Sequence, residues 1–165
     1  MKIKGRAWKY GDHVNTDVIF PGKYTYTISD PAEMGPHALE DLDPEFAKNV
    51  KPGDVVVGGK NFGCGSSREQ APQSIKSAGA GAIIAKGFAR IFYRNCINIG
   101  LPALTSAEAV DATLHGDPVE VDLEGGTITV KGKKFTFPPF TGYAKMIIDN
   151  GGLIPHTRKA LGIDK

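Results

Sequence analysis

Three short apolar runs, separated by two segments of helical spacing, restrict most strongly what this chain can fold into. The runs cover residues 54–58, 82–85 and 101–104, and each has the length of a buried strand. The helical spacing appears in two sets of apolar residues: Ala71, Ile75 and Ala78, and then Phe88, Phe92, Cys96 and Ile99. Glycines follow both helical patterns and are typical of helix ends. This order predicts an α/β fold whose parallel strands are joined by right-handed crossovers.

The region before this core is expected to contribute one strand and one irregular segment. Residues 2–10 are mostly alternating and predict a strand. Residues 22–51 are polar and rich in proline, with no sustained period except a short helix expected within 31–41. A segment of this length outside the core is usually functional or mobile. We therefore expect residues 22–51 to form a functional or mobile segment outside the core.

The C-terminal third changes character and predicts an added β-hairpin followed by a helix. Apolar residues alternate over 119–123, and residues 127–130 can pair with residues 135–137 across a glycine-containing turn. A helix is expected at 144–149, and a basic tail follows Pro155. With 165 residues in all, the chain has the length of a single domain spanning 1–165.

Composition excludes several classes of protein. Hydrophobic residues make up 41% and charged residues 23%, which excludes wholesale disorder. The net charge of +2, with scattered basic residues, argues against nucleic acid as a partner. No apolar run approaches the roughly 20 residues that span a bilayer, and the N-terminal sequence has no secretory h-region. We therefore expect a cytoplasmic protein without a membrane partner.

The cysteines and histidines predict no metal site within this chain. Cys64 and Cys96 alone cannot hold a four-thiolate iron–sulfur cluster or a structural zinc ion, and the four histidines lack metal-ligand spacing. A disulfide is not expected in a reducing compartment. Cys64 as a nucleophile is the weaker interpretation, because no histidine lies nearby in the sequence, and a small loop residue explains it better.

The most informative local sequence is the glycine-rich turn between the first core strand and its helix. Gly63 and Gly65 lead into two adjacent hydroxyls, Ser66 and Ser67, and then into the cation Arg68. A turn of this kind leaves backbone N–H groups free at the start of a helix. Because the guanidinium of arginine matches a carboxylate, the turn predicts a site for a small carboxylated anion.

Two interpretations of the serines remain open at this point. Ser66 with Glu69 has the spacing of a capping box, but this register places Pro72 well inside the helix. A helix that begins nearer Arg68 or Glu69 places Pro72 in its first turn and leaves both hydroxyls ahead of the helix. The second register makes the serines available for function.

Three sequence blocks resemble the swivelling domain of the aconitase superfamily. They are Asn61-Phe62-Gly63-Cys64-Gly65-Ser66-Ser67-Arg68-Glu69-Gln70, then the block from Phe88 to Pro102, and Asn15-Thr16-Asp17-Val18-Ile19 with Pro21. The blocks keep the order of that family and cover most of residues 1–105. Together with the length, they are similar to the separate small subunits of 3-isopropylmalate dehydratase. The resemblance implies a swivelling β/β/α domain.

The resemblance also implies that the active site is formed by two chains. In the family, a large subunit holds a [4Fe-4S] cluster that binds the substrate, and the swivelling domain closes over it. Carried over to this chain, Ser66 is the catalytic base, Ser67 and Arg68 bind a substrate carboxylate, and Asp17 supports the site. The reaction eliminates water and returns it with the hydroxyl on the neighbouring carbon. Gln70 departs from the family pattern, in which many relatives have histidine.

The resemblance implies that substrate choice depends on the mobile segment that follows the first block, residues 22–51. In the family this segment contacts the variable group of the substrate, and here it contains Lys23, Tyr24, Thr25 and Tyr26 but no arginine. Homoaconitase-like relatives use an arginine there for an additional carboxylate, so its lack argues against a tricarboxylate, although Lys23 weakens the argument. The tyrosines either line a pocket for an isopropyl or methyl group or face solvent.

The resemblance favours 2- and 3-isopropylmalate as substrates, through 2-isopropylmaleate, as in leucine biosynthesis. Subunits of hydratases for dimethylmaleate, citraconate or homoaconitate are the related alternatives. A non-catalytic module that binds anions is an alternative of another class, but binding alone has less need of both serines. Nucleic-acid binding ranks last, because no basic face can be inferred.

Overall fold

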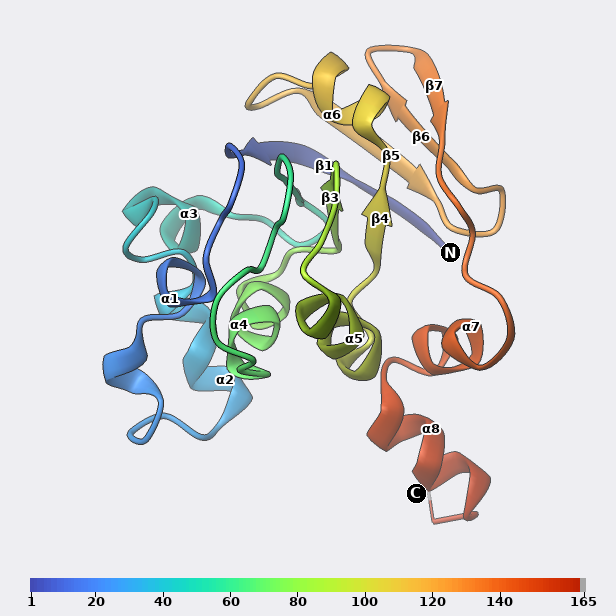
Figure 1. Cartoon of the computed structure of the whole chain (residues 1–165). Coiled ribbons are helices and arrows are strands. Elements are labelled where there is room, and N and C mark those ends of the chain that lie inside the picture. Colours follow the sequence, from blue (N-terminus) through green and yellow to red (C-terminus); the bar gives the residue numbers. More distant parts are fainter. Residues whose placement is uncertain (164–165) are drawn as a thin grey trace.

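The computed structural model describes residues 1–163, which form one mixed sheet of seven strands with helices on both faces (Figure 1). The strands are β1 (Lys2–Lys9), β2 (Val55–Val57), β3 (Ala82–Ala85), β4 (Ala103–Thr105), β5 (Pro118–Asp122), β6 (Thr127–Val130) and β7 (Lys133–Thr136). Their order in the sheet is β4-β3-β2-β1-β5-β6-β7. The predicted α/β fold class is confirmed.

The parallel half of the sheet has the predicted topology. Strands β1 to β4 are parallel neighbours, with Ala7 opposite Val55 and Ile83 opposite Ala103. The crossovers are α4 (Gln70–Ala78) and α5 (Arg90–Ile99), and glycines in the left-handed conformation end both. β4 begins later than predicted because the Leu101 amide still donates to the Cys96 carbonyl at the end of α5 (2.9 Å).

The sheet separates two apolar clusters, and β2 shows how one short strand contributes to both. Val56 packs on the side of α4 and α5, whereas Val55 and Val57 pack on the opposite side. Side chains alternate between the faces of a strand, so a run of three valines is buried on both sides. The other helical segments are α1 (Thr16–Ile19), η1 (Gly22–Tyr24), α2 (Pro31–Met34), η2 (Gly35–His37), α3 (Pro44–Asn49), α6 (Ala107–Ala112), α7 (Gly142–Asp149) and α8 (Leu153–Ala160).

The predicted hairpin is present, but it continues the sheet. β5 pairs antiparallel with β1 along five residue pairs, from Lys2–Asp122 to Arg6–Pro118. β6 and β7 follow antiparallel, and their apolar side chains cover the cluster that contains Val55 and Val57, together with α6. β1 therefore joins the parallel and antiparallel halves, which the sequence pattern did not reveal.

The polar segment 22–51 packs against the core more closely than expected. Met34, Leu39 and Phe46 are buried in the cluster that contains α4 and α5. The expectation of a non-core segment is thus wrong for these residues, since α2 buries Met34 and α3 buries Phe46 within a polar sequence. The mobility of residues 22–51 and their role in specificity stay predictions.

The C-terminal region ends in two helices. The helix predicted at 144–149 is α7, which starts two residues earlier, at Gly142. No helix was predicted after residue 149, but residues 153–160 form α8, with Pro155 in its first turn, where proline is tolerated, and the basic residues Arg158 and Lys159 in its last turn. No helix in the described range 1–163 is long and apolar enough to cross a membrane.

Candidate active site

Three loops that leave the carboxyl ends of β1, β2 and β3 are hydrogen-bonded side by side. The Gly63 amide donates to the Val14 carbonyl and the Thr16 amide to the Cys64 carbonyl, both at 2.8 Å. The Phe62 amide donates to the Gly87 carbonyl at 2.9 Å. Ligands of open α/β sheets commonly bind beyond these strand ends. The pairing fixes the Asn-Thr-Asp block against the glycine-serine turn and the start of α5.

Positions 63 and 65 of the turn both require glycine. Both have positive φ angles, 83° and 102°, which favour glycine. A Cβ on Gly63 would lie 2.0 Å from Cγ of Phe92, and one on Gly65 would lie 2.7 Å from Oδ1 of Asn15. The two glycines thus let the turn approach both α5 and the loop that precedes α1.

Ser66 and Ser67 lie ahead of α4 and do not cap it. The helix begins at Gln70, and its N-cap residue, Glu69, makes no capping hydrogen bond through its side chain. Pro72 is therefore the third residue of the helix and sits in its first turn. Of the two registers left open by the sequence, the structure has the later one. Both serines are exposed.

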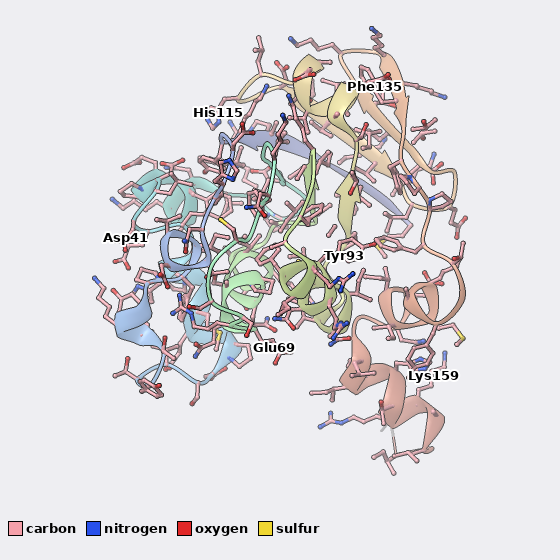
Figure 2. The ribbon with its side chains drawn as sticks, viewed as in Figure 1. Asp41, Glu69, Tyr93, His115, Phe135 and Lys159 are labelled. Carbon is pink, nitrogen blue, oxygen red and sulfur yellow. The ribbon has the colours of Figure 1, made fainter. Side chains whose placement is uncertain are left out.

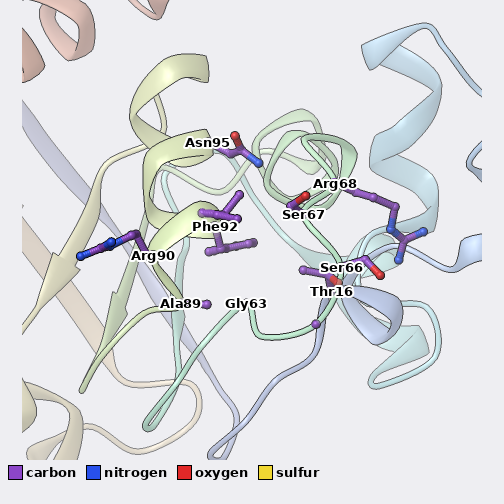
Figure 3. A pocket seen from close by; sticks show the side chains of 11 residues that line it. Thr16, Gly63, Ser66, Ser67, Arg68, Ala89, Arg90, Phe92 and Asn95 are labelled. Carbon is purple, nitrogen blue, oxygen red and sulfur yellow. The ribbon is translucent and has the colours of Figure 1, made fainter.

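The serine–arginine turn lines a cavity of about 260 Å³ (Figure 3). Thr16 contributes from α1, and the start of α5 forms the opposite wall. The cavity is lined by Thr16, Gly63, Gly65, Ser66, Ser67, Arg68, Ala89, Arg90, Ile91, Phe92 and Asn95. Two arginines and no carboxylate occur among these lining residues of the described chain. The cavity is therefore suited to a small anion.

Arg68 connects the cavity to the segment that follows α1. Its Nη2 forms an ion pair with Oδ1 of Asp17, and its Nη1 donates to Oγ1 of Thr25 at 2.9 Å. The side chain of Arg68 is only 16% exposed, whereas that of Asp17 is 64% exposed. Within the described residues, Nε of Arg68 is buried without a hydrogen-bond partner. Three predicted site residues, Asp17, Thr25 and Arg68, are thus in direct contact.

Gln70 holds the same segment from the first turn of α4. Its Nε2 donates to the carbonyl oxygens of Thr25 and Ile28, both at 3.1 Å. Residues 25–28 are therefore fastened to α4 by two side chains, Arg68 and Gln70. Gln70, which departs from the family pattern, therefore positions residues 25–28 in this chain.

The remaining predicted substrate residues lie outside the cavity. Tyr26 is 98% exposed. The Tyr24 hydroxyl donates to Oε1 of Glu40 at 3.1 Å, and its ring packs on Phe20 and His37. Lys23 is exposed, with its ammonium 5.0 Å from the Tyr24 ring centre. Lys23, Tyr24 and Tyr26 are absent from the described residues that line the cavity. Their contact with substrate stays a prediction.

Among the lining residues are four polar, charged or aromatic side chains that were not assigned to the site. They are Thr16, Arg90, Phe92 and Asn95. Thr16 belongs to the Asn-Thr-Asp block and the other three to the block from Phe88 to Pro102, so the blocks themselves were the available signal. No chemical role could be assigned to these residues from the sequence, because their proximity to Ser66 arises from the pairing of the three loops.

Cysteines and histidines are dispersed through the described chain. Cys96 is fully buried, which raises the pKa of its thiol, and Cys64 is partly exposed. His115 stacks edge-on against Trp8, far from Glu69 at the start of α4 (Figure 2). Within residues 1–163, no group of three or more histidine, cysteine, aspartate or glutamate residues is placed to hold a metal ion.

The chain is similar to known proteins in sequence and in fold. Residues 14–109, which include the whole glycine-serine turn and α5, match the family model of the aconitase C-terminal domain. At the level of fold alone, the chain is similar to aconitase X of Thermococcus kodakaraensis, with a TM-score of 0.54 and 20% identity over 79% of this chain and 90% of that one. The class of protein is therefore that of aconitase C-terminal domains.

Relatives that match nearly the full length of this chain identify the family within this class. The 3-isopropylmalate dehydratase small subunit of Thermodesulfovibrio yellowstonii is 49% identical and covers 99% of this chain and 98% of its own. That of Caldanaerobacter subterraneus is 55% identical, with coverage of 95% and 98%. The crystal structure of a 3-isopropylmalate dehydratase from Methanocaldococcus jannaschii superposes with a TM-score of 0.92 at 47% identity, covering 99% and 97%. This chain belongs to the family of 3-isopropylmalate dehydratase small subunits.

Proposed function

We propose that this chain is the small subunit of a two-chain hydro-lyase that interconverts 2-isopropylmalate and 3-isopropylmalate through 2-isopropylmaleate, a step of leucine biosynthesis. The family supports the class of reaction. The observation that carries the proposal is the exposed Ser66 at a cavity with two arginines and no lining carboxylate among the described residues. A hydroxyl in positive surroundings can act as a base, because its alkoxide is stabilised there.

In this mechanism Ser66 removes a proton from the carbon next to a carboxylate of the substrate. The hydroxyl of the adjacent carbon leaves as hydroxide, so a carbon–carbon double bond forms while the proton stays on Ser66. In the second half, hydroxide adds to the carbon that lost the proton, and Ser66 gives its proton to the carbon that lost the hydroxyl. A [4Fe-4S] cluster, held by the large subunit, supplies Lewis acidity for the departing and returning hydroxyl.

Ser67 and Arg68 bind one carboxylate of the substrate. Arg68 is held in place by Asp17 and Thr25, so little of its side-chain freedom remains to be lost when substrate binds. Asp17 therefore acts as a positioning residue for Arg68. Among the described residues, Nε of Arg68 is buried without a partner, whereas its other two nitrogens contact Asp17 and Thr25.

The substrate side group is proposed to contact the segment that contains Lys23, Tyr24, Thr25 and Tyr26. Residues 22–28 contain no arginine that could pair with a third carboxylate. This favours an isopropyl or methyl group over the additional acid of homoaconitate. The partner is the large subunit, and location in the cytoplasm stays a prediction from composition.

Replacement of Ser66 by alanine tests the proposed base. The chain is combined anaerobically with its cluster-loaded large subunit, and hydration of 2-isopropylmaleate is followed. Because general acid–base catalysis contributes typically 10²–10⁴-fold, Ser66→Ala should reduce kcat by about that factor. The melting temperature should stay unchanged, since Ser66 is exposed and does not cap α4.

Ser77→Ala is the matched control, because Ser77 lies in the last turn of α4 and outside the described cavity lining. It should retain the wild-type rate. A Ser66→Ala complex with wild-type turnover would remove Ser66 as the base. Parallel assays with dimethylmaleate, citraconate and homoaconitate identify the substrate. Faster turnover of any of these than of 2-isopropylmaleate would assign that compound as the substrate instead.

A further inference from the structure

Two further cavities, here called the outer cavities, adjoin the Ser66 cavity at the start of α4. One, of about 490 Å³, lies between α4, α5 and α8, and Glu69, Asn98 and Ile154 contribute to its lining. The other, of about 370 Å³, lies between α2, α4 and α8 and is also lined by Glu69 and Ile154. Glu69 directly follows Arg68, which lines the Ser66 cavity. The three cavities thus form one hollowed surface, here called the α4–α5 face.

One side of α5 connects the Ser66 cavity to the larger outer cavity. Arg90 lines the Ser66 cavity, and Asn98, two turns further along the helix, lines the larger outer cavity. Arg94 lies midway between them in the sequence and is exposed. Because residues four apart lie on the same side of a helix, these three side chains share one surface of α5. The α4–α5 face is therefore continuous along this helix.

Two large apolar side chains are exposed on this face. Ile91, which lines the Ser66 cavity, is 49% exposed, and Ile154, which lines both outer cavities, is 67% exposed. Ile154 belongs to α8, an eight-residue helix in which no residue is buried. A helix this short is marginal in water unless it packs on something else. Exposed apolar side chains around a hollowed surface are typical of a site of contact with another protein.

The α4–α5 face carries an excess of positive charge. Among the described residues that line its three cavities, three are cations and one is a carboxylate: Arg68, Lys76, Arg90 and Glu69. Arg94 adds an exposed cation on α5, and Arg158 and Lys159 add two in the last turn of α8. Charges across protein interfaces are usually complementary, so a partner that covers this face should present carboxylates.

We propose that the large subunit docks on the α4–α5 face, with an apolar segment flanked by carboxylates packed against Ile154 in the outer cavities. The inference rests on the proposed function, which requires the cluster of the large subunit to face Ser66. Because the outer cavities continue the surface of the Ser66 cavity, a chain that covers Ser66 extends over them. A second copy of this chain fits less well, since a symmetric contact would bring two positive faces together.

Ile154→Glu tests the apolar contact. The variant should fold with an unchanged melting temperature, because Ile154 is exposed and an acidic residue is favoured in the first turn of a helix. In anaerobic titrations with the cluster-loaded large subunit, its Kd should be at least about tenfold higher than that of the wild type, since buried apolar anchors carry much of the binding energy. Leu114→Glu is the matched control and should bind like the wild type. Leu114 is 60% exposed, lies outside the lining of the three cavities and follows α6, at the end of the molecule opposite α8 (Figure 1).

Arg94→Glu tests the charge of the face, with Lys134→Glu as a control that changes the net charge by the same amount. Both residues are exposed, but Lys134 lies on β7, in the antiparallel half of the sheet. At low salt, Arg94→Glu should associate with the large subunit about tenfold more slowly than Lys134→Glu, because charges at an interface mainly affect the association rate. High salt should reduce this difference, since it screens exposed charges.

The outcomes separate this proposal from the proposed function. A wild-type Kd for Ile154→Glu, or equal association rates for Arg94→Glu and Lys134→Glu, would overturn the docking surface. Sedimentation of the free chain tests the second copy: self-association that Ile154→Glu abolishes, with an unchanged Kd for the large subunit, would assign the face to a second copy instead. A wild-type complex that Ile154→Glu weakens but that hydrates no 2-isopropylmaleate would support the docking surface and refute the proposed function alone.

Discussion

Pro72 lies in the first turn of α4, where its missing N–H group costs no helical hydrogen bond. Because proline is disfavoured further inside a helix, this residue opposes a start at Ser66 and favours one at Gln70. The two serine hydroxyls consequently remain outside the helix and line the cavity. One residue four positions beyond Arg68 thus affects which atoms are available for chemistry.

Asp54 is the clearest case of a single buried charge in this fold. It is 2% exposed and accepts hydrogen bonds from the amides of Arg6 and Lys51, at 2.9 Å each, and from Nε1 of Trp8 at 3.0 Å. Burial alone raises the pKa of this carboxyl, but the hydrogen bonds together hold the pKa below its usual value. The carboxylate ties β1 to the start of β2.

Asp54→Asn should therefore destabilise the chain in a way that depends on pH. At neutral pH the loss is about 1–3 kcal/mol, because an amide NH₂ group replaces one accepting oxygen among three donors. A lowered folded-state pKa gives stability that is fully present above the unfolded value of about 3.9 and is lost as pH falls through the folded value. Urea unfolding at neutral and acidic pH measures this. If the difference in unfolding free energy between the wild type and Asp54→Asn were as large at acidic pH as at neutral pH, the lowered pKa of Asp54 would be contradicted.

At the scale of elements, the segment after α1 is positioned by the first turn of α4. Arg68 bonds the Thr25 hydroxyl, and Gln70 bonds the carbonyls of Thr25 and Ile28. Short helical turns alone would not hold this polar segment, since isolated helices of this length are marginal in water. Its position relative to the cavity depends on these side chains.

Gln70→Leu should loosen this segment without unfolding the domain. Two donated hydrogen bonds are lost, so amide exchange in residues 25–28 should become faster and KM should rise several-fold. Gln73→Leu is the control, because Gln73 lies one turn later and bonds only Ser77 among the described side chains. Equal exchange rates in the two variants would show that Gln70 does not hold the segment.

At the scale of the whole molecule, Lys76 joins the core to the C-terminal helices. Its ammonium donates to the carbonyl oxygens of Ile99, at the end of α5, and Gly151, between α7 and α8, the latter at 3.2 Å. Burial lowers the pKa of this lysine. Gly100 permits the close approach, because a Cβ there would lie 2.4 Å from the Gly151 carbonyl carbon.

Lys76→Met should release α8 from the rest of the fold. The aliphatic part of the side chain is kept, but the Ile99 and Gly151 carbonyls lose their donor. We expect faster amide exchange in residues 153–160 and a lower melting temperature. Lys48→Met, at an exposed position on α3, should change neither. Unchanged exchange in α8 of Lys76→Met would show that Lys76 does not hold this helix.

Much of the architecture was predictable because its signals are local. The run 82–85 is apolar on both faces, and Phe92, Cys96 and Ile99 repeat at helical spacing, so both elements appeared where expected. α8 was missed because none of its residues is buried, so it has no apolar stripe to detect. Met34 and Phe46 were missed because single apolar residues in short helices form no period.

By itself, the sequence determined the parallel strand–helix core, the glycine-serine turn and, through its motifs, the family. Such features are local, since each segment records in its own spacing which side it buries. Only the tertiary structure decided that Thr16, Ser66 and Asn95 share one cavity and that β1 joins the two halves of the sheet. The reason is that loops pair through backbone hydrogen bonds, and these leave no periodic trace in the side chains.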